Sequence, residues 1–271
     1  MIIILAAVLG RSFYEKRTIE ISLYSFSDSK IRRKLRIVYI SDLHGRCFDS
    51  NNSLIIGKIR ALKPDYVVIG GDLLDKRNMK SIDASLHFVK RLGKEFRVLY
   101  SFGNHEKYMM LHAKELVSDY FEKCSEYCNF VVGRSENLAV SGVNMIGYDF
   151  SHDIYKPSCK ELDSAVIEDI KSFKVSDSFN ILLAHDPYHF RDYVKTGADL
   201  VLSGHIHGGI VRLPGGRGLL SPRYTFFPKY SGGLYKKKGC SMIVSRGLGD
   251  HSIPIRINNK PEIVCVDLLP K

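Results

Sequence analysis

The stretch Leu35-Arg36-Ile37-Val38-Tyr39-Ile40-Ser41-Asp42-Leu43-His44 joins a mostly apolar run directly to two side chains that can bind metals. The run 35–41 predicts a buried strand that ends where Asp42 begins. Four further clusters have the same form, because each follows a short run rich in Val, Ile, Leu or Tyr. They are Gly71-Asp72, Gly103-Asn104-His105-Glu106, His185-Asp186-Pro187 and Gly204-His205-Ile206-His207-Gly208-Gly209. The pattern predicts that strand-then-loop units bring seven oxygen and nitrogen ligands to one edge of a sheet.

The remaining sequence supplies the elements around these clusters. Apolar residues spaced three and four apart predict helices, whereas short alternating or apolar runs predict strands. The expected helices are 51–62, 81–92, 107–127 and 160–173, and the expected strands are 18–25, 35–41, 66–69, 96–101, 130–132, 138–140, 143–147, 179–184, 200–203, 241–245 and 263–268. Strands and helices alternate in the first half, and strands dominate the second. We therefore expect a mixed α+β fold, a four-layer α/β/β/α sandwich of two mixed β-sheets flanked by helices. Ligands in such folds collect at the carboxyl ends of strands.

The chain has 271 residues and a formal net charge of +11, with basic runs at 30–36 and 236–238. Such charge favours a phosphorylated substrate or an anionic membrane surface as partner. We expect no nucleic-acid partner, because neither an aromatic-rich RNA-binding strand nor a zinc finger accompanies the charge. The stretch 213–239, rich in Gly, Pro, Tyr and Lys, predicts a long loop.

Residues 1–9 are uniformly apolar but far fewer than the roughly 20 residues that span a bilayer. They fit a buried strand, a shallow membrane anchor or the remnant of a longer signal. We expect an N-terminal apolar and basic segment, 1–30, capable of membrane contact, and a single domain from 31 to 271. The six cysteines form no disulfide framework, which favours a reducing compartment. The expected location is the cytoplasm, with peripheral attachment to the inner membrane face left open.

The ordered motifs D-x-H, G-D, G-N-H-E, a lone His and G-H-x-H resemble those of the calcineurin-like metallophosphoesterase superfamily between Leu35 and Gly209. Within it, the chain resembles a bacterial group of the YkuE type, related to enzymes that cleave the pyrophosphate of UDP-diacylglucosamine. That second resemblance depends on SDLHG at 41–45, LLAHDP at 182–187, GHIHGGIVRLP at 204–214, KYSGGLY at 229–235, VSRGLGD at 244–250 and PIRINNKPEI at 254–263.

The resemblance implies a dinuclear metal centre. It implies that Asp42, His44 and His207 hold the first ion, that Asn104, His185 and His205 hold the second, and that Asp72 bridges both. A bridging hydroxide would then attack phosphorus, and His105 would contact the phosphate and protonate the leaving oxygen. Asp75 is expected to orient His105. Manganese is the first expectation for the two divalent ions, and iron, zinc and nickel accept the same ligands.

The expected activity is hydrolysis of a phosphodiester or pyrophosphate bond in a lipid-linked or membrane-associated substrate such as UDP-diacylglucosamine. Arg212, Arg217 and Arg223, in the long loop, are candidates for binding a phosphate. Two alternatives remain: a phosphodiesterase or phosphatase acting on soluble nucleotides, and a non-catalytic scaffold of the same fold. Residues 71–77 read GDLLDKR and lack the longer motif of protein phosphatases, so a phosphoprotein substrate is disfavoured.

Overall fold

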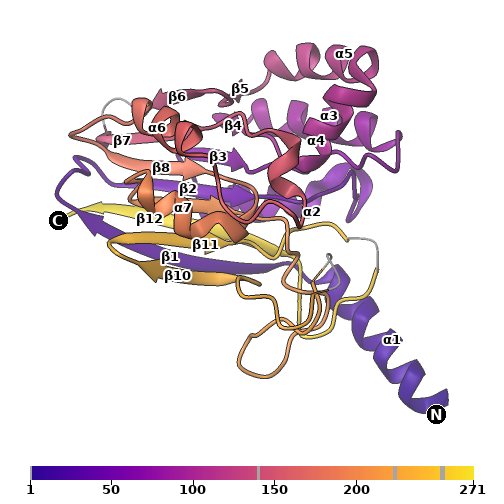
Figure 1. The fold of residues 1–271 in the computed structure, drawn as a ribbon. Helices are drawn as coiled ribbons and strands as arrows, with labels where there is room; N and C mark the ends of the chain where they lie inside the picture. Colours follow the sequence, from indigo (N-terminus) through magenta and orange to yellow (C-terminus); the bar gives the residue numbers. More distant parts are fainter. Residues whose placement is uncertain (1, 139–140, 222–224, 251–253) are drawn as a thin grey trace.

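The computed structural model describes residues 2–138, 141–221, 225–250 and 254–271, which form two six-stranded sheets (Figure 1). The first sheet has the order β1-β12-β2-β3-β4-β5. Its strands are β1 (Glu20–Asp28), β12 (Glu262–Pro270), β2 (Leu35–Ile40), β3 (Tyr66–Ile69), β4 (Val98–Tyr100) and β5 (Asn129–Phe130). Strands β2 to β5 are parallel, and β12, which pairs in parallel with β1, runs antiparallel to β2.

The second sheet has the order β10-β11-β9-β8-β7-β6. Its strands are β10 (Gly233–Lys237), β11 (Cys240–Val244), β9 (Leu200–Ser203), β8 (Phe179–Leu183), β7 (Val143–Gly147) and β6 (Arg134–Asn137). Its four central strands are parallel, and the two edge strands, β10 and β6, are antiparallel to their neighbours. Both sheets are therefore mixed, as predicted.

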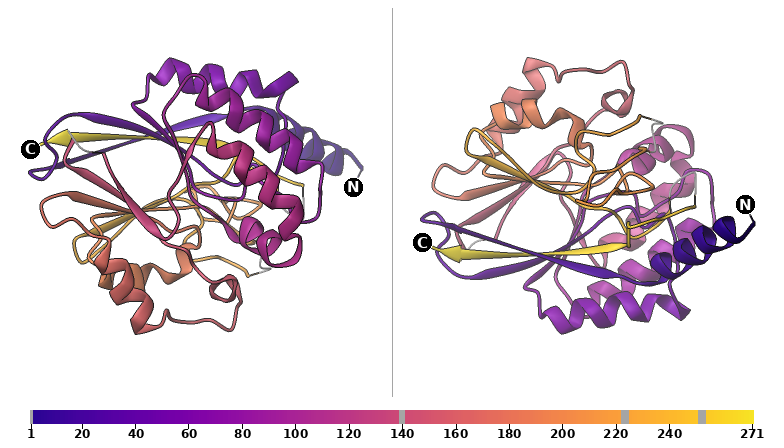
Figure 2. Two further views of the ribbon diagram at one scale, coloured as in Figure 1. Left: turned by 90° about the horizontal axis from the view of Figure 1, so that it is seen from above. Right: turned by 90° about the horizontal axis from the view of Figure 1, so that it is seen from below.

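Helices cover the outer face of each sheet, so the molecule has four layers (Figures 1 and 2). Helices α2 (Ser53–Leu62), α3 (Ser81–Gly93), α4 (Asn104–His112) and α5 (Lys114–Ser125) lie on the first sheet, whereas α6 (Ser164–Ser172) and α7 (Phe190–Lys195) lie on the second. Short 3-10 turns are also present at η1 (Ser50–Asn52), η3 (His152–Tyr155) and η4 (Pro187–His189). The predicted α/β/β/α sandwich is confirmed.

Strand β2 shows why the apolar runs were recognisable in the sequence. Ile37 and Tyr39 point into the core between the two sheets, and Val38 and Ile40 point into the core beneath the helices. Successive side chains of a strand face opposite sides of the sheet. Because both sides are covered here, both sets of positions are apolar and the strand has no polar alternation.

Several predicted elements need correction. The helix expected over 107–127 begins earlier, at Asn104, and is broken at Ala113, whose φ of −143° and ψ of 42° are not helical. The helix expected over 160–173 is confined to α6. The strand expected over 138–140 falls partly on residues 139–140, which lie outside the described residues, and β6 precedes it. Strand β10 lies inside the stretch predicted as a loop, and α7 was not predicted.

The N-terminal segment is helical from Ile2 onward, so of the three alternatives for residues 1–9 the buried strand is wrong. Helix α1 (Ile2–Arg17) projects from the body of the molecule (Figure 1). Its last turns contact the segment near Asn259, since Ser12 Oγ accepts from the Arg256 amide and Glu15 Oε2 accepts from the Asn259 amide at 2.7 Å. A helix places Ser12 and Glu15, which are three residues apart, on the same side, so both can make these polar contacts. No helix among the described residues is both long and apolar enough to cross a membrane.

Candidate metal centre

The loops that follow β2, β3 and β9 have an unusual backbone. Five of the candidate ligands in these loops lie in the left-handed region, where most side chains are disfavoured at a cost of about 1–3 kcal/mol each. They are Asp42 (φ 54°), His44 (φ 52°), Asp72 (φ 53°), His205 (φ 70°) and His207 (φ 50°). All five are predicted metal ligands. Such concentrated strain is found where a site requires a particular geometry.

Two glycines of the motifs allow the carboxylates to approach the neighbouring loops. A Cβ atom at Gly103 would overlap the Asp72 carboxylate, and one at Gly204 would overlap the Asp42 carboxylate. Each carboxylate accepts a backbone hydrogen bond at the same place: His105 N donates to Asp72 Oδ1 at 2.8 Å, and His205 N donates to Asp42 Oδ1 at 2.9 Å. The glycines of G-N-H-E and G-H-x-H therefore make room for the acids of the other motifs.

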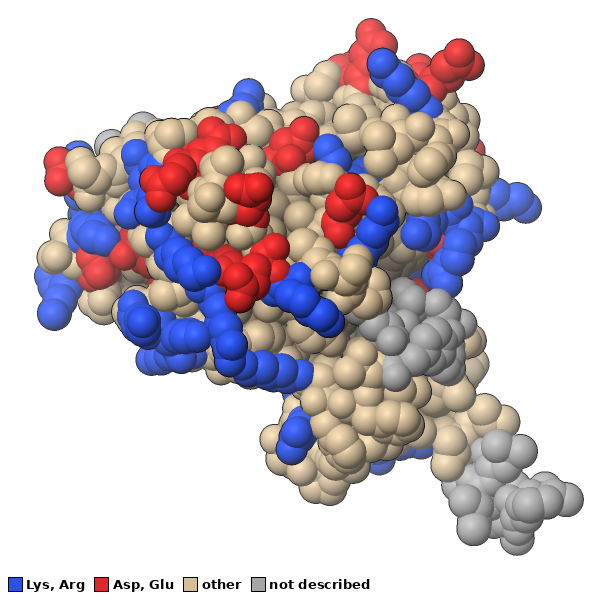
Figure 3. All heavy atoms as spheres, in the orientation of Figure 1, with Lys and Arg blue, Asp and Glu red and all other residues tan. Residues whose placement is uncertain are grey.

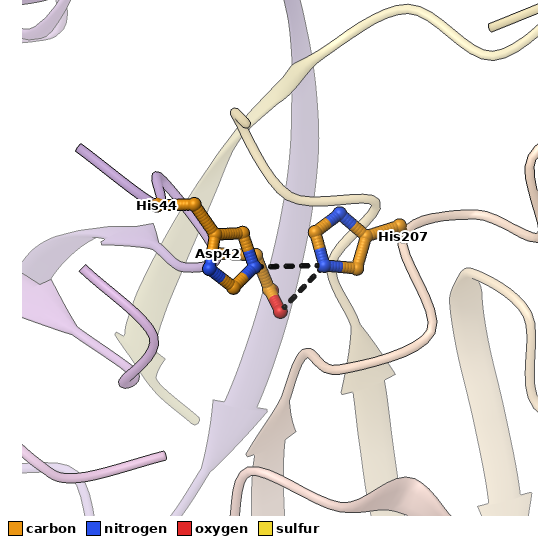
Figure 4. Close-up of side chains that lie close together, drawn as sticks. All are labelled: Asp42, His44 and His207. Carbon is orange, nitrogen blue, oxygen red and sulfur yellow. Dashed lines mark hydrogen bonds and ion pairs between the residues drawn. The ribbon is translucent and has the colours of Figure 1, made fainter. Parts of the chain in front are cut away.

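The first group of candidate ligands is Asp42, His44 and His207, all buried (Figure 4). The Nε2 atoms of His44 and His207 are 3.1 Å apart, and His207 Nε2 lies 3.3 Å from Asp42 Oδ1. The two imidazole rings are stacked with an interplanar angle of 13°. Candidate ligand atoms from the two sheets thus lie close together, whereas the sequence predicted them at one edge of a single sheet.

The second group is Asp72, His185 and His205. His185 Nε2 lies 3.1 Å from Asp72 Oδ2 and 3.5 Å from Asp42 Oδ1, so the two groups adjoin. The rings of His185 and His205 meet edge to face, with centroids 5.4 Å apart. Asn104 begins α4 directly after β4. Its Oδ1 atom is buried and has no hydrogen-bond partner among the described residues.

Three of the histidines are held in the same tautomer. Their Nδ1 atoms lie within hydrogen-bonding distance of backbone carbonyls: His44 with Leu74 at 3.1 Å, His185 with Gly70 at 2.7 Å and His207 with Gly249 at 3.3 Å. A carbonyl oxygen only accepts, so each Nδ1 must carry the proton. In the neutral rings, the Nε2 lone pairs then face one another or a carboxylate. A cation relieves that repulsion, and outer contacts of this kind orient histidine ligands in metal sites. The residues therefore fit a pair of metal ions.

The pKa values of the candidate ligands follow from burial and from the charges of their neighbours. Burial raises the pKa of Asp42 above its ordinary value. Burial would also raise the pKa of Asp72, but the nearby His185 and His105 hold it well below the usual range. Burial would lower the pKa of His185, but the carboxylates of Asp72 and Asp42 raise it to about 10. The buried acids thus require positive charge beside them, which metal ions supply when they replace protons.

His105 lies beside the first group, with its ring centroid 4.6 Å from that of His44. Its Nδ1 atom accepts from the Lys76 amide at 3.0 Å and lies 3.4 Å from Asp75 Oδ1. Burial would lower the pKa of His105, but Asp72 and Asp75 raise it. The structure thus brings Asp75 next to the candidate catalytic histidine, and the role of each stays a prediction.

The three arginines predicted to bind substrate lie in different surroundings. Arg212 is buried, and its guanidinium donates to the carbonyls of Gly208, Gly216 and Ser231. Arg217 is exposed and lies 5.1 Å from the centroid of the Phe227 ring. Arg223 lies outside the described residues. The contacts of Arg212 organise the loop after the last ligand, and a substrate role for the three residues stays a prediction.

Sequence reasoning gave no role to two residues that support the ligands. Glu106 is buried, and its carboxylate accepts from the amides of Asp72, Leu74 and Gly103 and from the Tyr100 hydroxyl. Asn259 Nδ2 donates to the carbonyl of His207 at 2.7 Å. Both residues occur in motifs quoted above, G-N-H-E and PIRINNKPEI. Their presence in the motifs was visible, but their partners lie in distant segments and depend on the fold.

Comparisons with known proteins agree with this geometry. Residues 35–209 match the family model described as calcineurin-like phosphoesterase. An uncharacterised metallophosphoesterase of Helicobacter pylori strain J99 is 30% identical over 98% of this chain and 69% of its own length. YkuE of Bacillus subtilis, an uncharacterised metallophosphoesterase, is 28% identical over 86% of this chain and 78% of its own length.

Among solved structures, the protein TT1561 of Thermus thermophilus matches with a TM-score of 0.50 at 12% identity, covering 79% of this chain and 90% of that one. At this identity the match supports the fold alone. The family match covers more than half of the chain and includes every candidate ligand. The chain therefore belongs to the calcineurin-like phosphoesterase family and is a metal-dependent phosphoesterase with a dinuclear type of site.

Proposed function

We propose that this enzyme hydrolyses a phosphodiester or pyrophosphate bond with the help of two divalent metal ions. In this proposal, Asp42, His44 and His207 hold one ion, Asn104, His185 and His205 hold the other, and Asp72 bridges them. The observation that carries it is the shared orientation of His44, His185 and His207, whose Nε2 atoms converge on the two carboxylates. The unpartnered Asn104 oxygen supports the second ion.

When bound, the ions would neutralise the phosphate oxygens and lower the pKa of a water molecule that attacks phosphorus. The mixed set of carboxylate, imidazole and amide ligands suits manganese, and also iron, zinc or nickel. The chain's own contribution is to hold these ligands in fixed orientations. Backbone carbonyls fix the imidazoles, and backbone amides fix one oxygen of each carboxylate.

His105 is the proposed proton donor to the leaving oxygen. Its Nδ1 side is occupied by the Lys76 amide and the Asp75 carboxylate, so Nε2 is the atom left to act on a substrate. Asp75 would be a positioning residue, because it lies beside Nδ1 and not beside the Nε2 atom proposed to act on the substrate. Arg217 and Arg223 remain candidates for contacting an anionic part of the substrate from the long loop.

We further propose that the substrate is linked to a lipid or lies at a membrane, as in UDP-diacylglucosamine. Exposed apolar side chains support this idea: Phe13 and Tyr14 of α1 are 58% and 61% exposed, and Phe226 of the long loop is 68% exposed. Figure 1 shows α1 and this loop at the same end of the molecule. Exposed aromatic side chains of this kind insert into membrane interfaces.

Positive charge supports an anionic partner. Lys and Arg side chains gather over the face of the molecule that carries β10 and α7 (Figure 3). Five of them, Lys160, Arg191, Lys195, Lys237 and Lys238, line one cavity there together with the acids Glu161 and Asp192. A surface of this kind attracts an anionic leaflet or a phosphorylated molecule at low ionic strength.

Hydrolysis of bis-p-nitrophenyl phosphate and p-nitrophenyl phosphate with added Mn²⁺ tests the reaction. We expect turnover of the diester that requires metal, and a loss of at least about 100-fold in kcat for both Asp72→Asn and His105→Ala. His87→Ala, which changes an exposed histidine on α3, serves as the control and should keep wild-type activity. Preference for the monoester would redirect the substrate class, and an inactive protein that binds two ions would support the scaffold alternative.

A further inference from the structure

A line of aromatic rings leads away from the second group of candidate ligands. The Tyr155 ring lies 5.5 Å from the His205 ring and 6.2 Å from the His185 ring, between centroids. His152 follows at 6.3 Å from Tyr155, and Tyr108 follows at 5.8 Å from His152. The line crosses from η3 to α4, which pack against each other.

Lys76 connects the far end of this line, at Tyr108, to His105. Its Nζ atom lies 4.5 Å from the centroid of the Tyr108 ring, and its amide donates to His105 Nδ1 at 3.0 Å. Lys76, Tyr108, His152 and Tyr155 therefore surround one flank of the metal centre, and we call these four residues the flank subsite. Lys76, Tyr108 and His152 are each half-buried, so their outer atoms remain accessible.

Lys76 has no carboxylate partner among the described residues. The acids on the neighbouring segments are paired with other cations: Asp75 with Arg77, Asp149 with Lys107 and Asp153 with Lys156. Burial and the charge of Lys76 lower the pKa of His152, and the carboxylate of Asp153 opposes this shift in part. A lowered pKa disfavours the charged imidazolium, so the Lys76 ammonium is the group of the subsite best suited to bind an anion.

We propose that the flank subsite binds a second phosphate group, next to the scissile one, and so selects pyrophosphate-linked substrates over simple diesters. This inference rests on the proposed function and deepens it. A phosphate in this place would accept hydrogen bonds from the Lys76 ammonium, which are stronger than the contact of that ammonium with the Tyr108 ring. The flexible stem of Lys76 lets the ammonium turn from the ring toward the phosphate.

The competing explanation is that Lys76 only covers Tyr108. If Lys76 has only a packing role, its substitution should change the affinity for all ligands alike. If Lys76 binds phosphate, the substitution should change the affinity only for ligands that carry a second phosphate. A pair of nucleotides that differ by that one group, such as UDP and UMP, separates the two explanations. Their binding is measured by titration calorimetry on the manganese-loaded protein, with UDP supplied as its methylene-bridged analogue, which cannot be hydrolysed at that linkage.

We expect wild-type protein to bind UDP at least about tenfold more tightly than UMP, because the second phosphate adds a charged hydrogen bond. Lys76→Met should remove most of that difference while changing UMP binding little, and Lys76→Arg should retain it. Lys80→Met, which changes an exposed lysine four residues further along, is the matched control and should behave as wild type.

Equal affinities for UDP and UMP in the wild type would overturn the proposal, as would an equal loss of both in Lys76→Met. The diester assay described above reports on the reaction itself. A protein whose preference for UDP depends on Lys76, but which hydrolyses neither the diester nor a pyrophosphate-linked substrate with Mn²⁺, would contradict the proposed function while supporting the subsite. Metal-dependent hydrolysis without that preference would support the proposed function and overturn the subsite.

Discussion

Glu106 shows how one buried charge can organise several ligand loops. Its carboxylate accepts from the Asp72 amide at 2.8 Å and the Leu74 amide at 3.1 Å, and also from the Gly103 amide at 2.9 Å. Buried amides without partners each cost about 1–3 kcal/mol. One carboxylate thus provides hydrogen-bond acceptors for amides in the loop that holds Asp72 and in the turn that begins α4. Glu106, the last residue of the G-N-H-E motif, therefore stabilises the ligand loops as well as marking the motif in the sequence.

Asn259 has a similar role for the second sheet, because it holds the backbone of His207 in the loop that follows β9. Its side-chain amide donates to the His207 carbonyl at 2.7 Å, and its own backbone amide donates to Glu15 of α1. We predict that Asn259→Ala lowers metal affinity about tenfold, since partners beyond the ligands hold those ligands in place. Competition with a chelator measures the change.

The exposed residue Asn258 provides a control for that prediction, because its side chain donates to the Arg212 carbonyl and not to a ligand loop. Asn258→Ala should leave metal affinity near the wild-type value. Unchanged affinity in Asn259→Ala would show that the His207 backbone is held without this contact.

At the level of elements, the central strands were predictable because they are buried on both faces. β8, β9 and β11 are buried along their whole length, so contiguous apolar residues mark them in the sequence. β10 escaped prediction because it is an edge strand of sequence GLYKK with alternating exposure. An edge strand needs few apolar residues, and lysine is common there. Helix α7 has only six residues, too few to show a helical period.

The pairing of β2 with β12 gives a pH-dependent prediction. Arg36 on β2 lies directly opposite Asp267 on β12 and donates to both of its carboxylate oxygens, at 2.6 Å and 2.7 Å. These hydrogen bonds lower the pKa of Asp267. A lowered folded-state pKa stabilises the protein above the unfolded-state value, about 3.9, and that stability disappears as the pH falls through the folded-state value.

We therefore expect Asp267→Asn to reduce the free energy of unfolding by about 0.5–1 kcal/mol at pH 7, a modest value because the pair is partly exposed. The difference from wild type should shrink steadily below about pH 4. Urea unfolding at several pH values measures it. Asp119→Asn, on the surface of α5, is the control with a smaller effect. A difference that stays constant down to roughly pH 2, below the unfolded-state value, would argue against this account.

Across the whole molecule, the two sheets divide the candidate ligands between them. The first sheet supplies Asp42, His44, Asp72 and Asn104, and the second supplies His185, His205 and His207. The ligands follow the carboxyl ends of parallel strands, where such folds place their sites. The alternation of strands and helices therefore predicted the fold class. The clusters that follow strands predicted that the candidate ligands lie together, although at one edge of a sheet and not between two sheets. The supports from Glu106 and Asn259, and the flank subsite, depend on contacts between distant segments, which no local pattern encodes.

The division into a segment 1–30 and a domain 31–271 stays a prediction. Strand β1, which lies within the first segment, pairs with β12 from Glu20 to Asp28. Helix α1 docks on the segment around Asn259, so the N-terminal residues are connected to a candidate metal ligand.

The central claim is that two adjoining groups of side chains hold two metal ions. The most direct test is the metal content per chain, measured by mass spectrometry after loading with Mn²⁺ and gel filtration. We predict two ions in the wild type and in His87→Ala, and about one in His207→Ala and in His185→Ala, since each of the last two removes one ligand from one group. Wild-type protein that holds fewer than one ion, or variants that keep both, would contradict the account.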